Sequence, residues 1–85
     1  MKLRPLPSDR VSRRRAVYFD RQHMGYVVGI LNAGCWRYWA HGLSFEPLGN
    51  PTGYATEKAA GWAVLEGRRV VVAIAEGERV ERMAI

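Results

Sequence analysis

Only one segment of this chain, Thr56–Glu66, has the residues of a helix, whereas the other apolar segments alternate as strands do. Thr56 is a suitable N-cap and Glu57 suits the first turn, where a carboxylate meets the positive end of the helix dipole. A helix of about ten residues needs a packing partner to be stable. One helix cannot cover several strands, so one sheet face is left solvated, curled into a partial barrel or buried against a partner.

Strand-forming residues with period-two alternation occupy three segments before the helix and two after it. The three early strands are expected at Arg15–Asp20, Tyr26–Leu31 and Cys35–His41, and the two late ones at Arg69–Ala75 and Arg79–Ile85. Turns are expected at residues 22–25, 32–34 and 76–78. The pattern predicts an α+β fold: a small antiparallel sheet of four to five strands, in the order β-β-β-α-β-β, with one helix packed on one face.

Two further features concern packing. Trp62 is the one large side chain that the helix offers, which predicts that it is largely buried against the sheet, and Gly61 beside it suggests a close approach of the helix backbone. The segment Gly42–Gly53 holds two prolines and three glycines, which exclude a continuous element. It is expected to be either a functional loop or a loop packed down by Leu43, Phe45 and Leu48.

Length and composition limit the class of protein. A chain of 85 residues forms one domain, and 48% hydrophobic residues favour a folded one. There is no apolar run of about eighteen residues and no apolar signal segment, so neither membrane insertion nor secretion is expected. A single cysteine excludes an internal disulfide, which favours a cytoplasmic protein.

The net charge of +5 is concentrated at the start of the chain. Residues 1–15 hold six basic side chains and one acidic one, whereas the seven basic and seven acidic side chains of residues 16–85 balance. Because Pro5, Pro7 and Ser8 disfavour regular structure, residues 1–15 are predicted to be a flexible basic arm and residues 16–85 a single α+β domain. A cationic arm beside a strand favours phosphate binding, with Arg10, Arg13, Arg14 and Arg15 as the candidates.

The segment Cys35–His41 supplies a second candidate surface. If Trp36 and Tyr38 face the core, alternation places Arg37, Trp39 and His41 together on the opposite face. Arginine and aromatic groups on an open sheet suit phosphate contact and base stacking. The alternative is structural: Trp39 packs under the Gly42–Gly53 loop, and Arg37 pairs with Glu46 or Asp20.

Catalytic and cofactor chemistry has little support in the sequence. Cys35 and His41 lie about 20 Å apart along an extended strand, which is too far for a nucleophile and its base. The two histidines and the cysteine lack the spacing of metal ligands, and no glycine-rich phosphate loop is present. The sequence therefore predicts a protein that is not an enzyme and has no cofactor, metal or catalytic residue.

The junction into the helix, Gly53-Tyr54-Ala55-Thr56-Glu57-Lys58-Ala59-Ala60, resembles a family pattern. It is similar to the Gly-aromatic-x-Thr-x-x-x-Ala junction of the arm-type DNA-binding domains of phage integrases, which resemble plant AP2 domains. The resemblance covers residues 17–65. It implies three antiparallel strands followed by a helix, with the sheet entering the major groove of DNA.

Three functions follow as hypotheses. The first is a small non-enzymatic nucleic-acid-binding protein of phage or mobile-element type, with DNA favoured over RNA, which uses the basic arm and the exposed aromatic and arginine face. The alternative is a small interaction protein, an inhibitor of the anti-CRISPR kind or an adaptor, that binds a larger protein or ribonucleoprotein complex. The third is a homo-oligomer that pairs through its uncovered sheet face.

Overall fold

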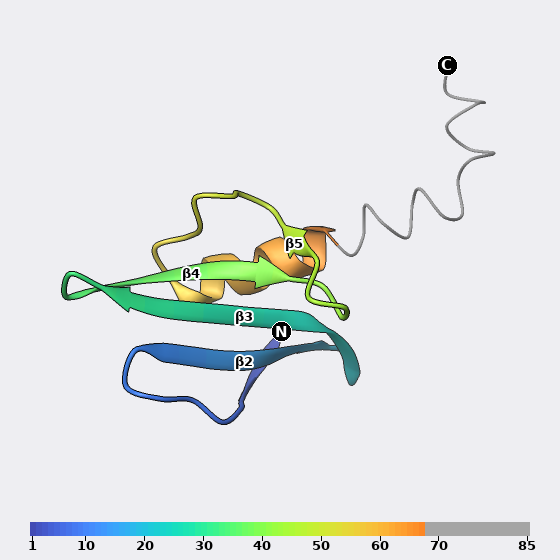
Figure 1. The fold of residues 1–85 in the computed structure, drawn as a ribbon. Helices are drawn as coiled ribbons and strands as arrows, with labels where there is room; N and C mark the ends of the chain where they lie inside the picture. The colour runs from blue at the N-terminus through green and yellow to red at the C-terminus, as the bar shows by residue number, and fades with distance from the viewer. Residues whose placement is uncertain (68–85) are drawn as a thin grey trace, which may run out of the picture.

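The computed structural model describes residues 1–67, which form one antiparallel sheet of five strands and one helix. Neighbouring strands in the chain are neighbours in the sheet, so the order is a simple meander, β1-β2-β3-β4-β5. Residues 57–67 are helical and lie behind β3 and β4 in Figure 1, so within residues 1–67 no helix covers the sheet face turned toward the viewer. The strand bounds are Lys2–Pro5, Ser12–Phe19, Gln22–Asn32, Cys35–His41 and Pro47–Leu48.

This architecture confirms the prediction of a small antiparallel α+β fold with one helix on one face. Within residues 1–67, however, all five strands precede the helix, because β1 and β5 form where no strand was expected. The two strands predicted at Arg69–Ala75 and Arg79–Ile85 lie outside the described residues. Of the predicted order β-β-β-α-β-β, the first four elements fall within the described residues. They correspond to β2, β3, β4 and the helix, but the short strand β5 comes between β4 and the helix.

The segment expected to be a flexible arm contributes to the sheet instead. Lys2–Pro5 pairs antiparallel with β2, and Ser12–Arg15 is the first half of β2 itself. Pro5 is tolerated because it ends an edge strand, where its missing N–H faces no partner. The loop between the strands is ordered by local hydrogen bonds: Leu6 N–H donates to Arg14 O, and Asp9 Oδ1 accepts from Val11 N–H and Ser12 N–H.

Two of the strand connections are tight turns with positive φ values. Asp20 (51°) and Arg21 (65°) join β2 to β3, and Ala33 (52°) and Gly34 (77°) join β3 to β4. A two-residue hairpin turn of type I′ requires positive φ at both positions. The predicted turn at residues 32–34 is confirmed, but the one at residues 22–25 is wrong, because those residues lie in β3. The physical reason is that the long β3 pairs with β2 up to Gln22.

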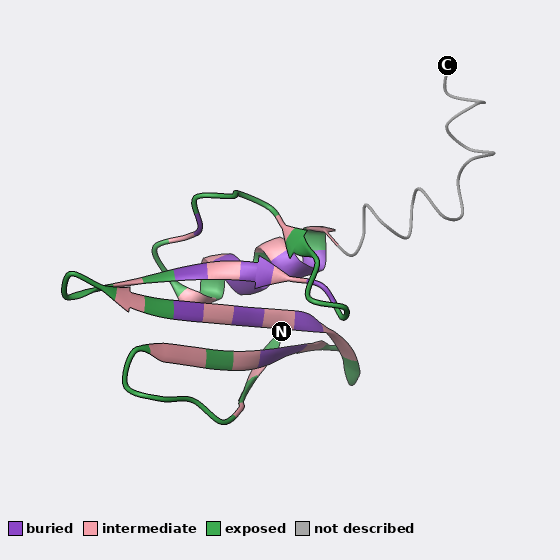
Figure 2. Ribbon diagram, in the orientation of Figure 1, coloured by how far each residue is buried: buried purple, intermediate pink, exposed green. Residues whose placement is uncertain are grey.

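The hydrophobic core lies between the sheet and the helix. Figure 2 shows buried positions alternating along β3 and β4 with positions that are more exposed, as period-two strands require. The helix comes close to the sheet at Gly25, where a Cβ atom would overlap His41 O and lie 2.7 Å from Val64 Cγ1. The buried members of the core are Val17, Val27, Tyr38, Ala40, Ala60, Val64 and Leu65.

Trp62 is not part of this core: half of its surface (50%) is exposed, so the prediction of its burial is wrong. The helix starts as predicted, since Thr56 Oγ1 accepts a hydrogen bond from Ala59 N–H. Its buried face is formed by Ala60, Gly61 and the pair Val64 and Leu65. Each residue advances about 100° around a helix, so Trp62 points away from the sheet when these four residues face it.

Candidate nucleic-acid interface

The sheet face opposite the helix, called the open face below, is basic and aromatic. No strand in the described chain contains an aspartate or glutamate. Alternation and register place the cations Lys2, Arg4, Arg14 and Arg37 on this face. Because no carboxylate on the strands neutralises them, the open face has a positive potential that attracts polyanions.

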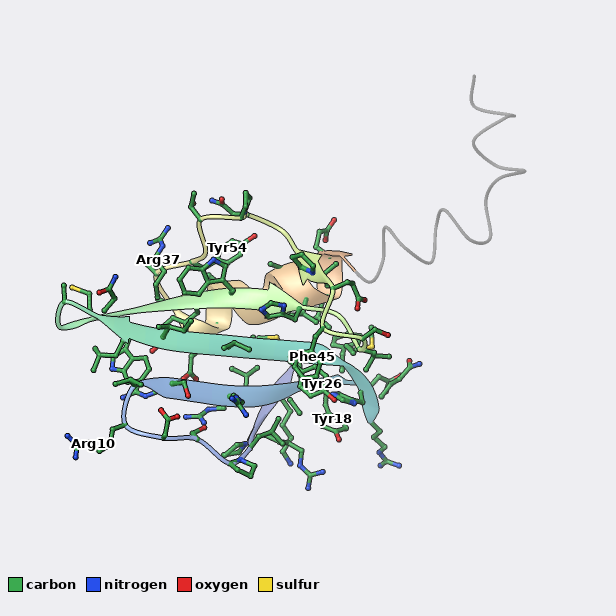
Figure 3. All side chains as sticks on the ribbon, viewed as in Figure 1. Arg10, Tyr18, Tyr26, Arg37, Phe45 and Tyr54 are labelled. Carbon is green, nitrogen blue, oxygen red and sulfur yellow. The ribbon has the colours of Figure 1, made fainter. Side chains whose placement is uncertain are left out.

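An aromatic row crosses one end of the open face, formed by Tyr18, His23, Tyr26 and Phe45. Tyr18 stacks on His23 at 5.1 Å between ring centroids, and His23 meets Tyr26 edge-on at 4.8 Å. Tyr26 stacks on Phe45 at 4.3 Å with only 9° between the ring planes. Figure 3 shows the three labelled members, Tyr18, Tyr26 and Phe45, in line at this end of the sheet. The row comes from β2, β3 and the loop after β4.

Phe45 is the most exposed member of the row and has an unusual backbone. Its exposed fraction is 56% and its φ is 58°, a conformation that bulky side chains rarely adopt. The loop holds it there: Phe45 N–H donates to Gly42 O, and Gly42 N–H donates to Glu46 O. Ser44 N–H also donates to the Glu46 carboxylate. The protein thus presents a flat aromatic side chain to solvent on a constrained loop.

The cations lie beside this row. The Arg4 guanidinium lies 5.4 Å from the centroid of the Tyr18 ring, which is cation–π distance. Arg14 is exposed, and its register partner on β3 is Val28. The open face therefore holds one cation against the aromatic row and others farther along the strands, a combination that suits contact with both phosphates and bases.

Arg37 and Trp39 lie on the open face as predicted, but the loop before the helix contacts both. Arg37 Nε donates to Thr52 O (2.7 Å) and its Nη2 to Gly53 O (3.1 Å). Trp39 Nε1 donates to Pro51 O at 3.0 Å, so its ring is half-buried beside this loop. The alternative that Trp39 packs under the loop is therefore correct in part. Arg37 donates to backbone carbonyls of the loop instead of pairing with Glu46 or Asp20, as that alternative expected.

The other predicted residues are spread over the molecule. Arg13 faces the helix side, where its guanidinium lies 3.9 Å from the centroid of the Trp36 ring and donates to Tyr38 Oη. Arg15 also faces that side and pairs with Glu57 of the helix at 3.5 Å. Arg10 is exposed in the loop between β1 and β2, far from the aromatic row in Figure 3. The structure therefore does not gather these three residues with Arg14 on one surface.

His41 lies on the open face, and its Nδ1 is 3.3 Å from Phe45 O. Sequence reasoning missed Arg4, Tyr18, His23, Tyr26 and Phe45. The alternation of β2 already separates Tyr18 from Val17, so that member was detectable. Phe45 carries no periodic signal, because its place on Tyr26 results from a loop that folds back over the sheet.

Other kinds of site find little support in the described residues. No three His, Cys, Asp or Glu side chains within residues 1–67 are placed to hold a metal ion together. No helix among them has the length and apolar character that a membrane span needs. Comparison of the chain with protein-family models, with curated proteins and with solved structures finds no match.

Proposed function

We propose that this chain is a non-enzymatic nucleic-acid-binding protein whose open face binds single-stranded DNA. The observation that supports this most is the aromatic row beside a cation on a face whose strands, within residues 1–67, have no carboxylate. Single-stranded nucleic acid is bound by that combination: basic groups contact the phosphates, and exposed rings stack on the bases.

The stacking part of the proposal depends on Phe45 and Tyr26. Their rings are nearly parallel, and Phe45 leaves more than half of its surface available. A base stacked on Phe45 extends a stack that the protein has already ordered, so little side-chain entropy is lost on binding. Bases in a duplex are not accessible to such a ring, which favours a single strand over a double strand.

The electrostatic part of the proposal also bears on self-association. Two copies paired through their open faces would bring the cations of one against the same cations of the other. Like charges in contact oppose association, and the five described strands offer no carboxylate to relieve this. The open face thus suits a polyanion better than a second copy of the chain. The resemblance to DNA-binding domains with three strands and a helix favours DNA over RNA.

The test is binding of a 12-nucleotide single strand, measured by fluorescence anisotropy at two salt concentrations. For the parent chain, log K should fall with log salt by about 0.7 for each phosphate that the cations neutralise. Phe45→Ala should weaken binding by about 5- to 150-fold, because it removes a stacking contact worth about 1–3 kcal/mol. Alanine at this position must adopt the same positive φ as phenylalanine, so the midpoint of thermal unfolding should stay close to that of the parent.

Trp62→Ala is the matched control, since it also removes a half-exposed aromatic ring but from the helix side of the molecule. Its affinity should equal that of the parent within twofold. The same oligonucleotide as a duplex should bind more weakly than the single strand. Failure of the parent to bind any strand at low salt would contradict the proposal and favour the hypothesis of a protein partner instead.

A further inference from the structure

A pocket of about 420 Å³ lies where β1 begins, beside the turn between β2 and β3. Its lining is mostly charged: Lys2 and Arg4 come from β1 and Arg21 from the turn, with Asp20 as the only carboxylate. The ring of Tyr18, over which Arg4 lies, forms another part of the wall. Met1 completes the lining. Three cations and one anion give the pocket an excess of two positive charges.

The backbone conformation of the turn is a second observation that distinguishes this pocket. Arg21 has a φ of 65° at the second position of the turn, where Gly34 stands in the corresponding turn between β3 and β4. A non-glycine residue in this conformation is destabilised relative to glycine, because its Cβ crowds the backbone. The turn retains a long cation despite that cost, and this cation lines the pocket. Strain held at one residue in this way is common at binding sites.

We infer that this basic pocket binds the terminal phosphate of a nucleic-acid strand whose adjoining bases stack along the aromatic row. This rests on the proposed function and adds end recognition to it. A terminal phosphate carries a charge of about −1.5 to −2 at neutral pH, whereas an internal phosphodiester carries only −1. The pocket's excess of two positive charges matches the terminal group. Arginine is well suited to it, because its planar donors bind phosphate oxygens in pairs.

The basic pocket and the aromatic row are adjacent on the surface. Tyr18 lines the pocket and is also the first ring of the aromatic row. A strand that places its end phosphate between Arg4 and Arg21 therefore brings its next bases toward His23 and Tyr26. Internal phosphates then lie over the remaining cations of the open face.

The experiment compares three versions of one 12-nucleotide DNA strand, with a 5′-phosphate, with a 3′-phosphate and with hydroxyls at both ends. The full chain should bind one of the phosphorylated strands about tenfold more tightly than the hydroxyl-ended strand, as a new charge-assisted hydrogen bond would predict. Inorganic phosphate added as a competitor should remove this preference at concentrations that leave the hydroxyl-ended strand bound.

Three variants assign the preference to the pocket. Arg21→Gly should abolish it and raise the midpoint of thermal unfolding by about 4–8 °C, because it relieves the positive φ in a domain of this size. Asp20→Asn should increase it, since the pocket loses its one negative charge and asparagine tolerates the turn conformation. Lys58→Ala removes one positive charge from an exposed position on the helix and should leave the preference unchanged.

Failure of this inference is distinguishable from failure of the proposed function. If all three strands bind within twofold of one another, the pocket does not recognise an end phosphate, although the open face still binds DNA. If Arg21→Gly keeps the preference, the pocket is likewise excluded. If none of the three strands binds, both the inference and the proposed function are wrong.

Discussion

At the scale of single residues, two positions combine an unfavourable backbone conformation with an exposed functional group. Phe45 and Arg21 both have positive φ, and each presents a side chain that would be useful to a nucleic-acid ligand. At Gly34, by contrast, a Cβ atom would meet nothing within 4 Å, and glycine is present. Asp20 and Ala33 have the same conformation, so what matters at Phe45 and Arg21 is what their side chains contact: the Tyr26 ring for Phe45 and the basic pocket for Arg21.

Trp62 and Val64 lie two residues apart on the helix and should respond very differently to truncation. Trp62→Ala should change the free energy of unfolding by about 1 kcal/mol or less, because half of the side chain is already in water. Val64→Ala should cost about 2–3 kcal/mol, because Val64 is fully buried and the lost methyl groups leave a cavity. Urea unfolding of both variants measures the difference. A larger loss for Trp62→Ala would contradict the observed orientation of the helix.

Asp9 gives the loop between β1 and β2 a pH dependence. The N–H of Val11, followed by the hydroxyl and N–H of Ser12, holds the pKa of this carboxyl below its ordinary value of 3.8. A lowered pKa in the folded state means that ionised Asp9 stabilises the fold above pH 3.8 and that this contribution is lost as the pH falls through the lowered value.

Asp9→Asn is the variant that isolates this effect. We expect the parent to unfold at a higher temperature than Asp9→Asn at pH 6, and the gap to close as the pH drops below 3.8. Thermal unfolding followed by circular dichroism from pH 6 to pH 2 checks this. A gap that stays constant over the whole range would show that ionisation of Asp9 does not contribute to stability.

At the scale of elements, the basic N-terminal segment is part of the sheet and not a detachable arm. Removing residues 1–15 deletes β1 and half of β2, a strand that pairs on both sides. We therefore expect that deletion to abolish cooperative unfolding. Removing only residues 1–5 should lower the free energy of unfolding by at least about 2 kcal/mol, since Leu3 packs against the core.

Thermal unfolding of the two truncated chains measures this difference. The comparison also bears on binding experiments, because a truncated chain that has unfolded says nothing about phosphate contacts. A chain without residues 1–15 that still unfolds cooperatively near the temperature of the parent would contradict the pairing of β1 with β2.

At the scale of the whole molecule, the two faces of the sheet have different roles: one contains the core and the other the candidate interface. One face packs against the helix through small and branched side chains and contains the buried core. The open face holds cations in excess of carboxylates, within the described residues, and stacked rings. Even the basic run Arg13–Arg15 is divided in this way, since Arg13 and Arg15 contact groups on the helix side while Arg14 faces the open side. The candidate interface is therefore a property of the sheet as a whole, not of a charged segment.

The sequence alone determined what depends on near neighbours. Alternation defined β4 and assigned Arg37, Trp39 and His41 to the face opposite Trp36 and Tyr38, and the Thr56 cap located the start of the helix. These features follow from local backbone geometry, which a short stretch of sequence specifies.

Tertiary structure decided the rest. The pairing of Lys2–Pro5 with β2, the rotation of the helix that exposes Trp62, and the fold of Phe45 back onto Tyr26 all depend on residues distant in the chain. Local propensity disfavoured a strand at Pro5, and the size of Trp62 favoured burial. Pairing with β2 gives the backbone of Lys2–Pro5 hydrogen-bond partners despite Pro5. Ala60 and Gly61 let the helix lie close to the sheet, and this rotation of the helix turns Trp62 away from the core.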